Sequence, residues 1–229
     1  MWGVVCFLPV PFVLLVVASI AGHALGVDFT AGRAYVGIRL VVRTVTFLSL
    51  CLAARRKARQ VGRGDIAAGL GLVPIRRPRL VWLLIGATVV YQAVFLAVLL
   101  LFPSLQTLIP NDPFDVQTRQ AGLAFRGWSI LIICGLGPVG EEMLTRSWLW
   151  VGLRRRWGPL ATSIVTGLLF LALHLPESRY KPLFILPSVA LLGLARHYGG
   201  SLRASIAVHV FNNSLATTAE LVMEALGFD

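Results

Sequence analysis

Apolar stretches of about twenty residues recur along the whole chain, and this feature constrains its fold most. A helix needs roughly 20 mostly apolar residues to cross a bilayer. Windows of this kind cover residues 3–22, 34–53, 80–102, 128–153, 159–175, 182–197 and 204–226. The sequence therefore predicts an all-α fold, a polytopic transmembrane helix bundle of about seven spans, with eight as the alternative count.

Composition points the same way, because 57% of the 229 residues are hydrophobic and only 14% are charged. Soluble domains carry roughly 45–50% apolar and about 25% charged residues, and disordered chains are far less apolar. No repeat or low-complexity segment divides the chain, so we expect one membrane domain over 1–229. The first window has no basic segment before it, which favours a retained span over a cleaved signal peptide.

The distribution of basic residues predicts the orientation in the cell membrane. Thirteen of the 21 Lys and Arg fall in the linker 54–79, the turn 154–157 and the turn 197–203 with Arg196 and Arg203 at its edges, against five in the loops of the opposite side. Cytoplasmic loops carry such an excess, so we expect the N-terminus inside and the C-terminus outside. Segment 103–125, rich in helix breakers, becomes a polar outer loop. The net charge of +11 also suits nucleic acid, but no basic patch lies on a soluble domain, so no such partner is expected.

Two acidic residues, Glu141 and Glu142, lie well inside a predicted span. A charge in hydrocarbon costs several kcal/mol, which makes both candidates for a functional site. Arg146 lies four residues after Glu142 on the same helical face, in the favourable order for an ion pair. Glu141 is rotated by about 100° and has no partner in its own helix. The alternative is a purely structural ion pair that ties helices together.

Residues 135–140, with three glycines and a proline, come directly before the two acids. They predict a weakened or kinked helix at this point. Irregular backbone at membrane depth is tolerated where it is buried in protein or faces a wet cavity. The alternative is a packing kink at a helix contact.

Two later spans carry polar residues at helical spacing. His174 follows Phe170 by four residues, and Asn213 follows His209 by four. Each of these groups needs a polar partner that lipid cannot supply, so we expect them to surround one shared cavity with the two glutamates. Asn212 faces another way and is expected to be a helix-contact amide. By helical rise, His174 lies nearer the outer surface than the glutamates and His209, so tilt or a re-entrant turn must bring it in.

Together these residues resemble the CPBP intramembrane protease family, also called the CAAX-protease and bacteriocin-processing (Abi) family. The family's motifs EExxxR, FxxxH and HxxxN occur in order at 141–146, 170–174 and 209–213. The resemblance covers about 128–220, the predicted catalytic core extends over 128–226, and residues 1–127 carry no signature. Thr145 and Ser147 depart from the family, which commonly has an aromatic residue and a glycine there.

The resemblance implies a glutamate-dependent endopeptidase that acts without a covalent intermediate. Glu141 would be the general base on a water molecule that His174 helps to hold. His209 and Asn213 would donate to the oxyanion, and Glu142 with Arg146 would orient the first motif. Peptide hydrolysis needs this set of an activated water, an oxyanion site and a proton donor.

The expected partners are the lipid bilayer and a peptide or lipidated-peptide substrate, with no cofactor. A catalytic zinc held by Glu141, His174 and His209 is the mechanistic alternative, since these are zinc ligand types. Two other functions stay open: a non-catalytic protein of the same fold, as in bacteriocin self-immunity, and a small transporter that uses the acid as a proton relay. The predominance of Arg over Lys is typical of GC-rich prokaryotic, here bacterial, genomes.

Overall fold

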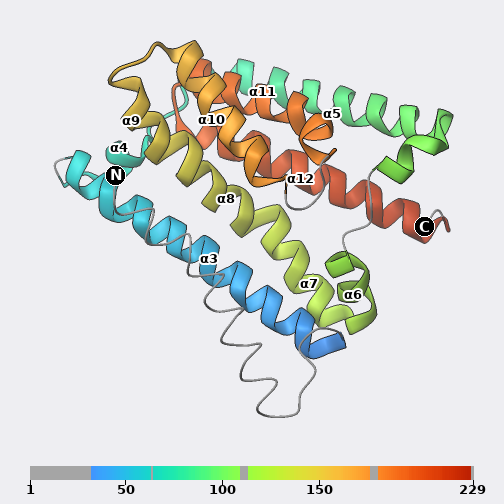
Figure 1. Ribbon diagram of the computed structural model, residues 1–229. Helices are drawn as coiled ribbons and strands as arrows, with labels where there is room; N and C mark the ends of the chain where they lie inside the picture. Colours follow the sequence, from blue (N-terminus) through green and yellow to red (C-terminus); the bar gives the residue numbers. More distant parts are fainter. Residues whose placement is uncertain (1–31, 63, 109–112, 176–179, 228–229) are drawn as a thin grey trace.

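The computed structural model describes residues 32–62, 64–108, 113–175 and 180–227, and in these ranges all regular structure is helical (Figure 1). The predicted helical fold class is therefore confirmed for the described residues. The first predicted span, 3–22, and the prediction that it is retained lie outside them.

Six helical rods make up the described bundle (Figure 1). The third rod in chain order is continuous from α7 through two π-helical segments, η2 and η3, to α9. Each of the six remaining predicted spans coincides with one rod. In chain order the elements are α3 (Gly32–Val61), α4 (Ile66–Leu70), α5 (Pro78–Leu101), the 3-10 helix η1 (Pro103–Leu108), α6 (Pro113–Ala121), α7 (Leu123–Leu131), η2 (Ile132–Leu136), α8 (Gly137–Glu142), η3 (Met143–Leu149), α9 (Trp150–Arg154), α10 (Pro159–Leu173), α11 (Lys181–Gly199) and α12 (Leu202–Ala225).

In the described part of the chain, three helices are long and apolar enough to cross a membrane: Gly32–Gln60, Pro78–Leu101 and Leu123–Arg154. Pro159–Leu173 is apolar but shorter. Large apolar side chains also point outward, as a bilayer-embedded surface requires; Leu123 is 87% exposed and Leu160 73%. The described helices are consistent with a helical membrane protein, and the count of seven spans and the N-in orientation stay predictions.

Two segments that the sequence analysis assigns to loops are partly helical. The rod of α3 continues through the basic residues after position 53 as far as Val61, because cations are favourable near a helix C-terminus. The predicted outer loop 103–125 holds η1, α6 and the start of α7. Pro113, counted as a breaker, begins α6 instead, where its missing N–H costs no hydrogen bond.

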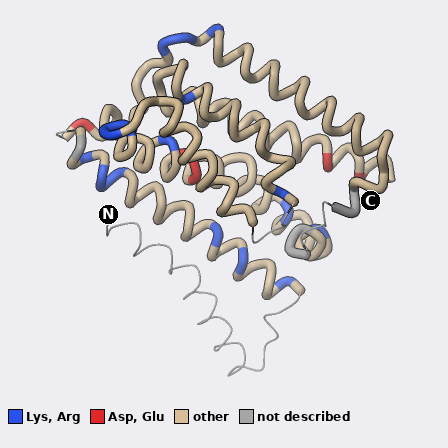
Figure 2. Tube along the Cα trace, turned by 45° about the horizontal axis from the view of Figure 1, so that its top comes forward, with Lys and Arg blue, Asp and Glu red and all other residues tan. Residues whose placement is uncertain are grey.

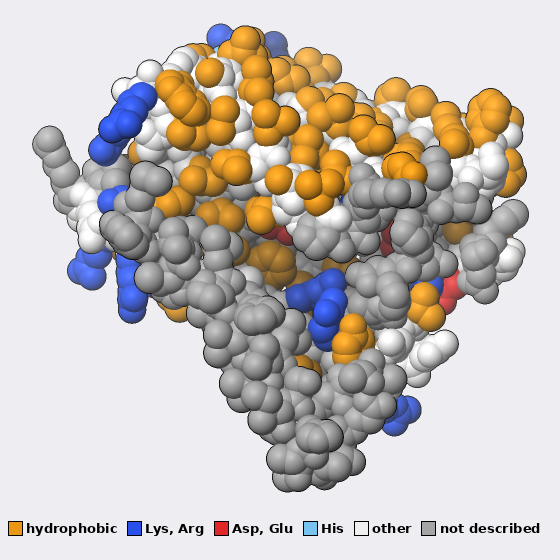
Figure 3. Space-filling model, viewed as in Figure 1, with side chains coloured by type: hydrophobic (Ala, Val, Ile, Leu, Met, Phe, Trp, Pro, Cys, Tyr) orange, Lys and Arg blue, Asp and Glu red, His pale blue; other side chains and the backbone are white. Residues whose placement is uncertain are grey.

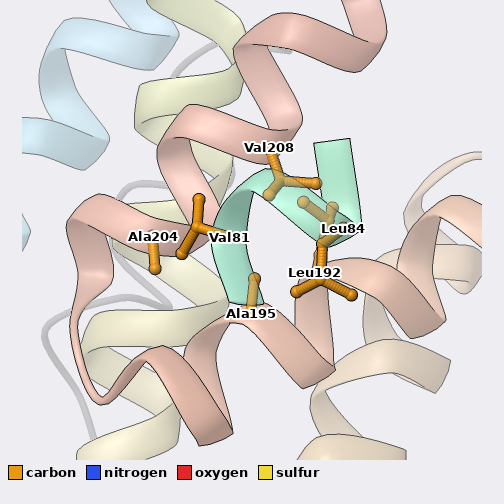
Figure 4. Close-up of a cluster of buried hydrophobic side chains, with 6 residues drawn as sticks. All are labelled: Val81, Leu84, Leu192, Ala195, Ala204 and Val208. Carbon is orange, nitrogen blue, oxygen red and sulfur yellow. The ribbon is translucent and has the colours of Figure 1, made fainter. Parts of the chain in front are cut away.

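The main apolar cluster joins α5, α11 and α12 (Figure 4). Small residues from α11 and α12 lie beside larger ones from all three helices, which lets the backbones approach closely. Its buried members are Val81, Leu84, Leu192, Ala195, Ala204 and Val208. This cluster fixes the first half of α12 against α5 and α11.

A close approach between α3 and α8 depends on Gly140. A Cβ atom added at this position would lie 2.9 Å from Cδ1 of Phe47, nearer than real Cβ contacts allow. The glycine directly before the two glutamates therefore lets α3 pack against the rod that carries them. Trp128 Nε1 strengthens this contact by donating to Thr44 Oγ1 at 3.2 Å.

Polar contacts fix the register between the rod Leu123–Arg154 and α12. Asn213 Nδ2 donates to the Ile133 carbonyl at 3.0 Å, and Cys134 lies 3.5 Å from Thr217 Oγ1. Further along, Arg126 forms an ion pair with Glu224. Because later residues of one rod meet earlier residues of the other, the two rods run antiparallel and bring their motifs to the same level.

At one end of the bundle, the segment before α5 is bound to the turn between α11 and α12. The Leu202 amide donates to the Gly71 carbonyl at 2.7 Å, and the Arg76 amide donates to the Gly199 carbonyl at 2.9 Å. Lys and Arg residues gather at this end (Figure 2). Basic segments that the sequence places on one side of the membrane thus lie at one end of the bundle.

Candidate active site

The helical geometry changes on both sides of the two glutamates. They end the short helix α8, which lies between the π-helical segments η2 and η3. Pro138 lies in the first turn of α8. The glycines and proline therefore change the winding of the rod without breaking it, and π-helical turns of this kind occur frequently at functional sites.

The first motif holds a buried ion pair. Arg146 Nη1 donates to Glu142 Oε1 at 2.8 Å, and the exposed fractions of the two side chains are 1% and 0%. The guanidinium also lies over the Phe170 ring, 4.8 Å from its centroid, a favourable cation–π contact. Glu142 Oε2 and Arg146 Nε are buried and have no hydrogen-bond partner among the described residues. The pair predicted from the i, i+4 spacing is present.

His209 lies between the two glutamates. Its Nδ1 is 3.1 Å from Glu142 Oε1 and its Nε2 is 3.6 Å from Glu141 Oε2. A carboxylate oxygen only accepts hydrogen bonds, so Nδ1 carries the proton and donates it to Glu142. The longer distance on the Nε2 side exceeds that of a direct hydrogen bond. Glu141 is 25% exposed, which leaves its carboxylate accessible as the helical rotation predicts.

Phe170 brings the second motif to the third. The His174 ring lies 4.7 Å from the Phe170 ring, and the His209 ring lies 5.6 Å from it. His174 follows the last residue of α10, and its Nδ1 donates to the Phe170 carbonyl at 2.9 Å. Its Nε2 is then the acceptor of the neutral ring. The Phe170 ring therefore lies beside both imidazole rings.

The side-chain amide of Asn213 is hydrogen-bonded at both its oxygen and its nitrogen. Its Oδ1 accepts from Asn212 Nδ2 at 3.2 Å, and its Nδ2 donates to Ile133. An amide nitrogen has two hydrogens. The second has no acceptor in the ranges that the structure describes, so it is available to a substrate oxygen.

Asn212 links this amide to two more helices. Its Oδ1 accepts from Gln92 Nε2 and from Ser188 Oγ, each at 3.0 Å. The side chain thus joins α5, α11 and α12, in agreement with the prediction of a helix-contact amide. Gln92 belongs to the part of the chain without a signature and was missed. The signal for it is a polar residue in the middle of the apolar run 80–102.

The sequence places Arg196 at the edge of the turn 197–203, whereas the structure continues α11 to Gly199. Arg196 lies within α11, is 8% exposed, and its Nε donates to the Arg146 carbonyl at 2.8 Å. Its guanidinium also lies 5.4 Å from the Trp150 ring centroid. The residue holds the π-helical backbone of the first motif. The predicted span 182–197 already included it, which was the available signal.

The surroundings of the site differ sharply from the outer surface. On the face seen in Figure 3, apolar side chains cover the upper helices, and charged side chains of both signs are visible in a hollow below them. A separate small cavity of about 80 Å³ lies between α7 and α12, and its lining includes Arg126, Ile133 and Thr217. Ile133 also accepts the hydrogen bond of Asn213, so this cavity borders the site.

Among the described residues, no three His, Cys, Asp or Glu side chains form a group that could hold a metal ion. In the zinc alternative, the metal ligands would be Glu141, His174 and His209. The structure brings His209 to Glu141 and, through Phe170, to His174. The expectation of no cofactor stays a prediction.

Comparison with known proteins identifies one family. Residues 123–215 match the model of the family described as type II CAAX prenyl endopeptidase Rce1-like. The match extends from the start of α7 into α12 and includes all six candidate site residues. It confirms the family resemblance, and this family is one of proteases. No curated protein and no solved structure matches the chain.

Proposed function

We propose that the Rce1-like domain at residues 123–215 makes this chain an intramembrane endopeptidase of the cell membrane. Its substrate would be a membrane-associated or lipidated peptide. The observation that carries the proposal is the position of His209, whose two ring nitrogens face Glu142 and Glu141 from another helix. A protease family match and a buried polar group of this kind together favour hydrolysis over a purely structural role.

Glu141 is the proposed general base. Its carboxylate is partly exposed and lies too far from His209 Nε2 for a direct hydrogen bond. It can therefore accept a proton from a water molecule and return it to the leaving amine. His174 supports this role. Its Nδ1 donates to the Phe170 carbonyl, so its Nε2 can accept a hydrogen bond from the same water.

Asn213 and His209 are the proposed oxyanion donors. Asn213 offers the second hydrogen of its amide. His209 donates from Nε2 only when its ring carries two protons, because Nδ1 already donates to Glu142. Glu142 and Arg146 are positioning residues in this scheme, since they hold the His209 ring and do not touch the substrate.

Asn213→Ala is expected to lower kcat by about 10²–10³, the usual loss when one oxyanion donor is removed. The loss should fall mainly on kcat, because the amide contacts the oxyanion chiefly in the transition state. Steady-state kinetics on a cleaved peptide measure it. An unchanged kcat would show that Asn213 does not donate to the oxyanion.

Gln92→Leu is expected to lower kcat by a smaller factor, about tenfold, because Gln92 acts through Asn212 and leaves Asn213 in place. Gln92→Glu keeps the shape but replaces the donating amide with acceptor oxygens facing Asn212 Oδ1, so it should not restore the rate. Full activity in both variants would show that the contact between α5 and α12 has no role in catalysis.

The proposal is tested with the full chain purified in nanodiscs and a farnesylated peptide that ends in a CAAX sequence, beside the same peptide without the lipid. Mass spectrometry of the products identifies the cleaved bond. We expect one internal cleavage of the lipidated peptide by the wild type and none by Glu141→Gln. Equal cleavage by both proteins would contradict the proposal.

A further inference from the structure

Three arginines surround the first turn of α5. Arg76, Arg77 and Arg79 lie on either side of Pro78 and are all exposed. Within the part of the chain that the structure describes, no carboxylate pairs with them. Together with Leu80 and Leu83 they line an open pocket of about 460 Å³. The pocket thus combines three positive charges with an apolar wall.

Two of these arginines are held in place by the turn between α11 and α12. The Arg76 backbone donates to Gly199, and its side chain lies across Gly200, where an added Cβ would come within 2.8 Å of Arg76 Cδ. Gly200 has φ +67°, so both its backbone conformation and this contact favour glycine. The Arg77 guanidinium lies 5.9 Å from the Tyr198 ring centroid. One continuous segment therefore lines the pocket, and residues 198–200, far away in sequence, hold two of its arginines.

The apolar side of the pocket continues along α5. Trp82 is 72% exposed and Leu83 is 69% exposed, on a helix long and apolar enough to cross a membrane. Its 24 residues extend for roughly 36 Å, slightly more than the hydrocarbon core of about 30 Å. The first turn of α5 and its arginines would then lie at the level of the lipid headgroups, with Trp82 at the boundary that this residue type prefers.

We propose that this pocket binds the headgroup of an anionic phospholipid. Arginine is well suited to phosphate, because its planar fork donates two parallel hydrogen bonds. The acyl chains would lie along Trp82 and Leu83, a surface that free phosphate would not use. Because Arg76 contacts the turn from which α12 begins, the bound lipid would also brace the helix that carries His209.

A general attraction between basic loops and anionic lipid would not need a pocket. The end of α3 provides the matched comparison. Arg55, Arg56 and Arg59 lie in the last turns of α3 and are also exposed, yet they do not line this pocket. Loss of either set removes three positive charges, so the two sets separate a specific site from net charge.

The experiment is a lipid titration of the full chain in neutral detergent, followed by native mass spectrometry. Phosphatidylglycerol and phosphatidylcholine are the probes. We expect the triple variant R76Q/R77Q/R79Q to bind phosphatidylglycerol at least about tenfold more weakly than the wild type. The control R55Q/R56Q/R59Q should stay within about threefold. The variant R76K/R77K/R79K keeps the three charges but loses the planar fork, so it should bind more weakly than the wild type.

Three results would overturn the proposal. Equal losses of phosphatidylglycerol affinity in the two Gln triples would show that net charge alone accounts for the binding. Equal affinity of the wild type for both lipids would show that the pocket does not recognise an anionic headgroup. Displacement of phosphatidylglycerol by an equal concentration of inorganic phosphate would identify a free-phosphate site. Should R76Q/R77Q/R79Q melt early in phosphatidylcholine, the Lys triple decides: weaker binding than the wild type supports the site, and binding equal to the wild type contradicts it.

Discussion

Glu141→Gln is expected to abolish peptide hydrolysis while the protein stays folded. A general base contributes about 10²–10⁴ to a rate, and Gln cannot take a proton from water. The side chain is 25% exposed and does not take part in the buried Glu142–Arg146 pair, so its amide should be accommodated. The measurement is kcat for a cleaved peptide together with the melting temperature of the variant.

The matched control is Glu220→Gln, the same chemical change on the exposed part of α12. Its kcat should stay within about twofold of the wild type, since it lies roughly 16 Å further along the helix than His209 by helical rise. If Glu141→Gln instead lost activity together with its melting transition, the loss would reflect unfolding. A folded and fully active Glu141→Gln variant would show that Glu141 is not the general base.

Arg146→Met is expected to give the largest loss of stability. It leaves the Glu142 carboxylate, which is 0% exposed, without its cation. Removing one partner of a buried ion pair costs about 3–5 kcal/mol. For a chain of this size that corresponds to a melting temperature lower by about 10 °C. Thermal unfolding of the purified protein in detergent measures the shift.

The double variant Glu142→Leu with Arg146→Met separates stability from catalysis. Replacing both partners of a buried pair with apolar residues is often neutral, so the double variant should recover most of the lost melting temperature. It should remain inactive, because Nδ1 of His209 loses the carboxylate that orients it. Arg146→Met with an unchanged melting temperature, or an active double variant, would contradict the role assigned to the pair.

The sequence was sufficient for those parts of the site that lie within one helix. The spacing of Glu142 and Arg146 predicts an ion pair by geometry that every helix shares, and the structure contains it. The rotation between Glu141 and Glu142 likewise predicts their different exposure. Apolar windows located the helical rods, because a bilayer-crossing helix needs a fixed length of apolar residues.

Contacts between helices could not be predicted from spacing. The meeting of His209 with both glutamates depends on the register between two antiparallel rods, and Asn213 reaches Ile133 for the same reason. Gln92 and Arg196 are further examples, since each acts on a residue of another helix. The contact between Phe170 and the ring of His209 is another example, because it joins α10 to α12, whereas the depth of His174 relative to the glutamates stays a prediction.

Loop boundaries failed for a different reason. Composition assigned 54–61 and 113–121 to loops, since the first is strongly basic and the second follows several prolines. Both are helical in the structure. A basic helix can continue beyond the hydrocarbon core into water, and proline is tolerated in the first turn of a helix, so neither feature excludes one.

The central claim is that protein side chains alone activate the water that cleaves the peptide. It is tested most directly by the cleavage rate of the purified wild type after its metal content has been measured and removed with a chelator. The account predicts an unchanged rate in the metal-free protein and no cleavage by metal-free Glu141→Gln. Loss of activity on chelation and its recovery with added zinc would contradict it, and would assign Glu141, His174 and His209 to a metal site instead.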